Sequence, residues 1–111
     1  MENEQKHQQS TIVGRRLRER RDALGLAQEK VGVAIGLDES SARARISRYE
    51  LGVHEPPFPT VKLLANVLEV PTPYMYCEDE DIARLLLAIY RIPTVQRNQK
   101  VSELITQLVD S

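Results

Sequence analysis

Cysteine and histidine are scarce in this sequence of 111 residues, which has one cysteine and two histidines. The lone Cys77 excludes a disulfide within the chain and suits a reducing compartment, and we interpret it as a small buried side chain rather than a nucleophile. Beside His7 and His54 there is no spacing typical of a metal site, and the sequence has no glycine-rich phosphate loop. We therefore expect no enzymatic activity, no metal site and no cofactor.

Long apolar runs are also absent, since no stretch approaches the length that a membrane-spanning helix needs. The first residues, MENEQKHQQSTIV, are polar and contain no hydrophobic signal segment, so we expect a cytoplasmic protein. Alternation of apolar and polar residues with period two is missing over any useful length, which argues against a β-sheet. The sequence therefore predicts an all-α fold.

Apolar residues recur instead at helical spacing, and glycines and prolines mark where the helices end. We expect residues 1–10 to be disordered. Residues 53–59, VHEPPFP, are expected to form a rigid loop because prolines do not fit inside a helix. A short turn is expected near residues 74–76. The predicted helices are residues 11–25, 27–36, 40–51, 60–70 and 79–92, and a last one after Pro93.

Positive charge is concentrated in one part of the chain, although the formal net charge is −1. Residues 12–52 contain nine basic and six acidic side chains, whereas residues 53–111 contain five basic and eight acidic ones. Three arginines, Arg43, Arg45 and Arg48, fall within six residues of one predicted helix. Such a run is most often a solvated helix face, but it is also typical of a helix that meets phosphates and base edges.

The residues around these arginines favour contact with nucleic acid. When residues 40–51 are wound as an α-helix, Ala42, Ile46 and Tyr49 share an arc of about 60°, which we expect to be buried. The opposite face consists mainly of small side chains edged by the arginines. Small side chains let a helix lie close in the major groove, where arginines reach phosphates or guanine and a methyl group contacts thymine. The small residues are Ser40, Ser41, Ala44 and Ser47.

The wider pattern resembles the phage-repressor-like helix-turn-helix family, of the Cro/repressor (XRE) type. Three segments carry the resemblance in combination, GLAQEKV, ISRYELG and LANVLEVP, and it covers about residues 13–76. It implies a lambda-repressor-like bundle of about five helices that acts as a transcriptional regulator, as a repressor in particular, on double-stranded DNA with a palindromic operator. Residues 11–77 would then form the DNA-binding domain, and residues 78–111 a C-terminal helical extension.

The resemblance also implies roles for individual residues. Gln28 would bond a phosphate and brace the recognition helix, rather than face solvent. Arg21 and Glu50 would pair and join the first helix to the end of the third. Gly32 stands where a small residue is needed, because two helices cross closely there. The expected DNA-binding residues are Gln28, Ser40, Ser41, Arg43, Ala44, Arg45, Ser47 and Arg48.

Three departures from the family pattern matter. The turn before the recognition helix is about four residues longer than usual, so that DESSAR either lengthens this helix or enlarges the turn, with Asp38 or Ser40 as its N-cap. His54 and Glu55 stand where basic residues are frequent, which predicts a weak grip on the DNA backbone there. Glu69 replaces the usual glycine after the fourth helix, which predicts a strained cap.

Other interpretations stay open. An antitoxin or a protein-interaction module would use the same fold, but an outer helix face of small residues and arginines favours DNA. The acidic run of residues 78–81 resembles a cation site, yet a charged first turn of the following helix is the better interpretation.

The C-terminal helices carry two apolar stripes, Ile82, Leu85, Leu86 and Ile89 in one and Val101, Leu104, Ile105 and Leu108 in the other. These stripes either fold back on the core of their own chain or join a second copy. We expect a homodimer, with Leu85, Ile89, Leu104 and Leu108 near the contact. No small-molecule ligand and no membrane contact is expected.

Overall fold

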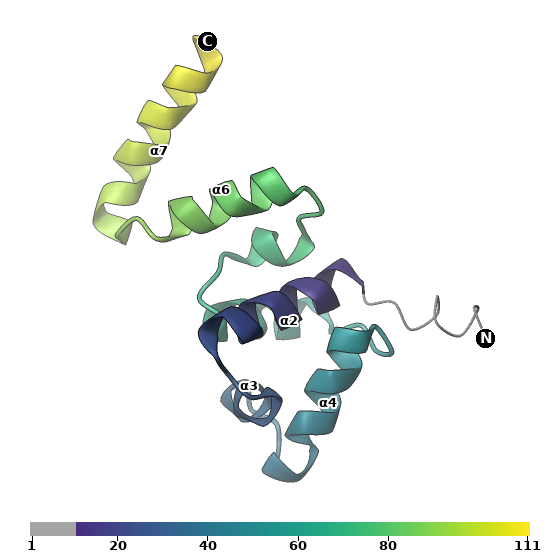
Figure 1. Cartoon of the computed structure of the whole chain (residues 1–111). Coiled ribbons are helices and arrows are strands. Elements are labelled where there is room, and N and C mark those ends of the chain that lie inside the picture. Colours follow the sequence, from purple (N-terminus) through teal and green to yellow (C-terminus); the bar gives the residue numbers. More distant parts are fainter. Residues whose placement is uncertain (1–10) are drawn as a thin grey trace, which may run out of the picture.

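A computed structural model describes residues 11–111, so the disorder expected of residues 1–10 lies outside the described part of the chain. The described residues contain helices and no strand, which confirms the all-α prediction. In Figure 1, α3 and α4 lie at one end of an elongated molecule and α7 at the other. None of the helices in residues 11–111 has both the length and the apolar character needed to cross a membrane. The elements are α2 (Ile12–Leu24), α3 (Gln28–Ala34), α4 (Glu39–Leu51), α5 (Phe58–Val67), the 3₁₀ helix η1 (Thr72–Tyr76), α6 (Glu80–Tyr90) and α7 (Thr94–Val109).

One hydrophobic core lies between α2, α3, α4, α5 and η1. The arc of α4 that we expected to be buried, Ala42, Ile46 and Tyr49, is buried. Burying these apolar faces is the main force that holds the helices together. The other large buried apolar side chains are Val13, Leu17, Val31, Val61, Leu64, Leu68, Val70, Tyr74 and Met75.

Two glycines let α4 approach its neighbours more closely than any other residue would. A Cβ atom on Gly32 would lie 2.6 Å from the Cβ of Ala42, and one on Gly14 would lie 2.5 Å from the carbonyl oxygen of Tyr49. Both distances are far below van der Waals contact. The small residue expected at position 32 is therefore a glycine because α3 and α4 leave no room for alanine.

Helix α5 begins earlier than the sequence suggested. We expected residues 53–59 to form a loop, but Phe58 and Pro59 belong to the first turn of α5. The prediction was wrong for these two residues. Backbone N–H groups in the first turn of a helix have no partner within the helix, so a proline, which lacks an N–H, fits there.

The strained cap predicted after α5 is present. Glu69 has φ of 61°, and within residues 11–111 it is the one residue other than glycine with a positive φ. Its backbone N–H donates to the carbonyl of Asn66, and the N–H of Val70 donates to the carbonyl of Ala65. These bonds close the end of α5 and hold Glu69 in the left-handed region.

The C-terminal extension divides the apolar surface of α6 between two environments. Ala83 is buried, and Leu86 and Leu87 pack against the core. Ile82 and Leu85, which we placed on the same stripe as Leu86, are 49% and 38% exposed. The stripe is therefore wider than the surface that the core offers.

Helix α7 has no buried residue and leans away from the bundle (Figure 1). It meets the rest of the chain mainly at its junction with α6. A lone helix of this length is only marginally stable in water.

Replacing Glu69 by glycine should stabilise the protein by about 1 kcal/mol, because the left-handed conformation costs a residue with a Cβ about 1–2 kcal/mol. Glu69→Ala is the matched control, since it removes the same charge but keeps the Cβ. Urea unfolding of the two variants measures the difference. Equal stabilities would show that the cap is not strained.

Candidate nucleic-acid interface

A short turn joins α3 to a long α4. The connection is residues 35–38 and α4 runs from Glu39 to Leu51, so the additional residues of this chain lengthen α4 and do not enlarge the turn. Asp38 occupies the N-cap position, where its backbone carbonyl accepts from the N–H of Ser41 at 3.0 Å while its side chain makes no capping bond. Ser40 and Ser41 lie in the added first turn and are exposed.

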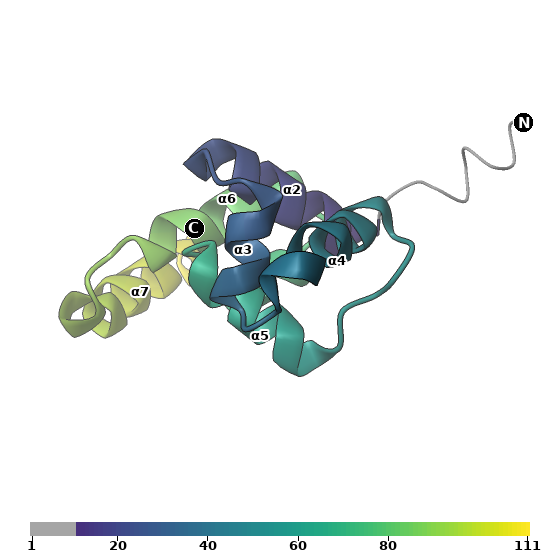
Figure 2. The ribbon, with the colours of Figure 1, turned by 90° about the horizontal axis from the view of Figure 1, so that it is seen from below.

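The outer face of α4 presents the residues that we expected to meet DNA. Arg43, Ala44, Arg45 and Arg48 are exposed, and Ser47 is half-buried. Figure 2 views the molecule from the end that carries α3 and α4, and no other helix covers α4 on this side. Small side chains occupy the middle of this face and arginines its edges, an arrangement that fits into a major groove.

The arginines of α2 and those of α4 are in different situations. The five arginines of α2 are bonded within the protein, to carboxylates or, for Arg20, to the carbonyl of Leu68. Over residues 11–111, by contrast, Arg43, Arg45 and Arg48 form no ion pair. Three exposed guanidinium groups on one helix therefore keep their charge available to an external anion.

A buried carboxylate holds the end of α4. Glu50, whose side chain is 4% exposed, accepts from Arg21 Nε at 2.6 Å and Nη2 at 3.2 Å, and from Gln28 Nε2 at 3.0 Å. The hydrogen bonding of Arg21 to Glu50 raises the pKa of Arg21, so the guanidinium stays charged. Helices α2, α3 and α4 meet at this one carboxylate. The structure thus brings together the three residues whose roles the resemblance implied.

Comparison with known proteins agrees with this geometry. Residues 17–75 match the model of the HTH_3 helix-turn-helix family. The chain belongs to this helix-turn-helix family. It is also similar to the crystal structure of the transcriptional regulator BswR, with 35% identity and a TM-score of 0.78, over 87% of this chain and 95% of that one. A search of curated protein sequences gives no significant match. Family and neighbour together support a DNA-binding regulator.

The loop after α4 adds a polar edge to the helix-turn-helix motif. Arg45, Arg48 and Tyr49 line a surface pocket of about 280 Å³ together with His54 and Glu55. His54 is tied to α4, since its backbone N–H donates to the carbonyl of Arg48 at 3.3 Å. Two arginines and one carboxylate thus share the C-terminal end of α4.

Sequence reasoning missed how much of the motif's architecture depends on arginine. Arg16 was not among the residues that we expected to be buried, but it is 1% exposed. Arg20 donates to the carbonyl of Leu68 at the end of α5 at 3.2 Å, a contact that the sequence did not predict. The signal that could have found Arg16 is its spacing, since it directly precedes the buried Leu17 and follows the buried Val13 by three residues.

Arg21→Ala should destabilise the fold by about 3 kcal/mol, because it leaves the buried carboxylate of Glu50 without its cation. Glu50→Ala should also destabilise it, and the double variant should lose less than the sum of the two, by about 1 kcal/mol or more. The exposed pair Arg18 and Asp22, 4.0 Å apart, is the control cycle and should show almost no coupling. Thermal unfolding gives both cycles. Additive losses at Arg21 and Glu50 would contradict the brace.

Proposed function

We propose that this helix-turn-helix protein is a transcriptional regulator that binds double-stranded DNA in a sequence-specific manner, with α4 in the major groove. The single observation that carries the proposal is the contrast between the bonded arginines on α2 and the exposed ones on α4, which form no ion pair with any of residues 11–111. A solvated helix face would gain nothing from three unneutralised arginines around small side chains. A DNA groove supplies both the phosphates and the close approach that this face requires.

In this proposal the residues of the interface form two groups, according to how far their side chains extend from the helix. The exposed serines and Ala44 lie where the backbone of α4 comes closest to base edges, and Arg43, Arg45 and Arg48 extend from its sides to phosphates or to guanine. Gln28 donates one amide hydrogen to Glu50 and keeps its carbonyl oxygen and second hydrogen for a neighbouring group. We assign it a phosphate contact in addition to its bracing role.

A repressor role fits this arrangement, because occupying an operator is sufficient to block transcription and needs no further surface. A protein-interaction module that does not bind DNA is one alternative. An acidic or bulky apolar outer face on α4 would favour it, whereas the exposed residues there, apart from Leu51 at the end of the helix, are small or basic. An antitoxin, whose front half binds its own operator, is the other alternative and would use the same face.

Arg48→Ala should lower the affinity for the selected operator by about 1–3 kcal/mol and relax base preference at one position. Arg84→Ala on α6 is the control, since its side chain is 81% exposed and α6 lies away from α4 (Figure 1). Selection from a random DNA pool, followed by titration at several salt concentrations, measures both effects. Binding should weaken steeply as salt rises, and no binding at low salt would contradict the proposal.

We further propose that the chain acts as a homodimer. Residues 11–77 would form the DNA-binding domain of each subunit, and the C-terminal extension, residues 78–111, would form the contact between the two subunits. Leu108 is 61% exposed and Ile105 53%, on a helix that has no core of its own. Residues 94–111 carry two basic and two acidic side chains, so two copies of α7 approach without repulsion. A palindromic operator needs two recognition helices, and a dimer supplies them. Leu85, Ile89 and Leu104 are the other side chains assigned to the contact.

Leu108→Asp should shift the protein from dimer to monomer, with a loss of about 2 kcal/mol or more in association, because a carboxylate would be buried between two apolar helices. Thr106→Asp places the same charge on another face of α7 and should leave the dimer intact. Sedimentation of both variants and the full chain, with and without DNA, decides between them. A full-length monomer at tens of micromolar would exclude this dimer.

A further inference from the structure

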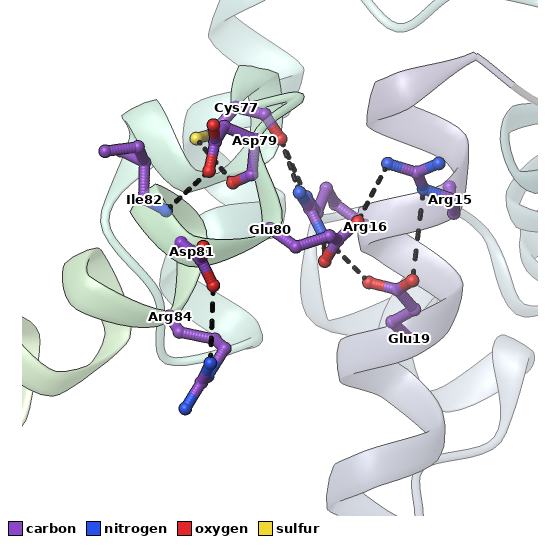
Figure 3. Close-up of polar contacts among 9 residues, drawn as sticks. All are labelled: Arg15, Arg16, Glu19, Cys77, Asp79, Glu80, Asp81, Ile82 and Arg84. Carbon is purple, nitrogen blue, oxygen red and sulfur yellow. Dashed lines mark hydrogen bonds and ion pairs between the residues drawn. The ribbon is translucent and has the colours of Figure 1, made fainter.

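Arg16 joins the helix-turn-helix part of the molecule to its C-terminal extension. Its Nε and Nη2 donate to the carbonyl oxygen of Cys77 at 3.0 and 2.6 Å, and its Nη1 donates to Glu19 and to Glu80, each at 3.1 Å. The guanidinium also lies over the ring of Tyr74, 5.1 Å from its centre. Figure 3 shows Arg16 reaching from α2 to the segment that leads into α6. We call these contacts the Arg16 joint.

Three members of the joint lie just beyond the part of the chain that matches the helix-turn-helix family. The family match covers residues 17–75, so Arg16, Cys77 and Glu80 fall beyond its ends, whereas Glu19 and Tyr74 lie within it. What the joint adds is a fixed relation between α2 and the start of α6.

Apart from an ion pair between Arg15 and Glu80 at 3.2 Å, the other contacts of α6 with the bundle are apolar and do not fix its direction. Ala83, Leu86 and Leu87 pack against the core, and hydrophobic burial of this kind is non-directional. A guanidinium that forks onto one carbonyl and one carboxylate is directional. Burial alone would lower the pKa of Arg16, but its hydrogen bonds to Glu80 and Glu19 outweigh burial and raise it, so the charge that holds the joint persists at all relevant pH values.

A second arginine fixes the next connection along the chain. Arg97 in the first turns of α7 donates through Nη2 to the carbonyls of Tyr90 and Ile92, at 2.9 and 3.0 Å, and lies over the Tyr90 ring. The carbonyl of Tyr90 belongs to the last residue of α6 and lacks a partner within the helix, and that of Ile92 lies in the link to α7. Two directional joints thus connect α2 to α6 and α6 to α7, and the Arg21–Glu50 pair connects α2 to α4.

We propose that the Arg16 joint determines the spacing between the two half-sites that the protein recognises. The inference rests on the proposed function, a DNA-binding dimer closed by residues 78–111. In such a dimer the two copies of α4 are separated by a path that runs through α2 and α6 of each subunit. A joint that holds α6 at one angle holds the two recognition helices at one distance and one rotation. Arg16 is therefore a positioning residue that does not itself touch DNA.

The test compares variants of neighbouring residues in the full chain. Glu80→Ala removes one arm of the joint from a side chain that is 63% exposed, so folding is not at risk. Asp81→Ala removes the same charge from the same first turn of α6, where Asp81 pairs only with Arg84 among the described residues. Arg16→Lys keeps the charge but loses the fork and serves as the second test. Each protein is titrated with the selected palindrome and with versions lengthened or shortened by one base pair.

One base pair rotates a half-site by about 35°, and we expect the wild-type protein to bind the altered sites about tenfold more weakly. In Glu80→Ala and Arg16→Lys this ratio should fall below about threefold, through weaker binding to the unaltered palindrome, while sedimentation and binding to a single half-site stay unchanged. Asp81→Ala should keep the wild-type ratio. An unchanged ratio in Glu80→Ala, or an equal fall in Asp81→Ala, would overturn this inference and leave the proposed function standing. A wild-type protein that neither dimerises nor binds DNA would contradict the proposed function itself.

Discussion

The position of α4 depends on one buried carboxylate. Glu50 is surrounded by protein and would be very costly to bury alone, yet it accepts three hydrogen bonds from α2 and α3. Because the donors come from two different helices, the carboxylate is satisfied only when all three helices are in place. Gly14 and Gly32 serve the same end by allowing the backbones to approach. The outer face of α4 is rigid because its inner face permits one arrangement.

The arginines of this chain have two different functions, and the composition of the chain alone does not distinguish them. Three of those on α2 act as structural joints, to α4 through Arg21, to α5 through Arg20 and to α6 through Arg16. Those on α4 form no ion pair within residues 11–111. A guanidinium is well suited to both roles, because it stays charged when buried and still presents a planar fork of donors. The neighbours of each arginine, and not the residue type, decide which role it takes.

Much of the fold could be predicted from the sequence, because helical periodicity and the glycine and proline stops depend on neighbours in the chain. The buried arc of α4 was accessible for this reason, whereas the strain at Glu69 was predicted from the family resemblance. The acceptors that satisfy Arg16 were not accessible, because they lie more than 60 residues away at Cys77 and Glu80. The start of α4 at Glu39 could not be predicted either, because the segment DESSAR is compatible with both a turn and a helix. The position of α3 decides where the turn ends. For the candidate site, periodicity predicted which residues lie outside but could not show which charges are neutralised.

The acidic residues before α6 complete the electrostatic design of the molecule. Asp79 caps α6 by accepting from the N–H of Ile82 at 3.0 Å, and Glu80 pairs with Arg15 and Arg16. The negative charges nearest α2 are therefore used within the protein, where they neutralise arginines that would otherwise compete with α4 for phosphates. Helix α7, at the end of the molecule that is remote from α4 (Figure 1), and the two residues after it carry as many basic as acidic side chains. A polyanion that approaches such a molecule is attracted to the exposed arginines of α4 more than to the α7 end, so that charge orients the protein before any base is contacted.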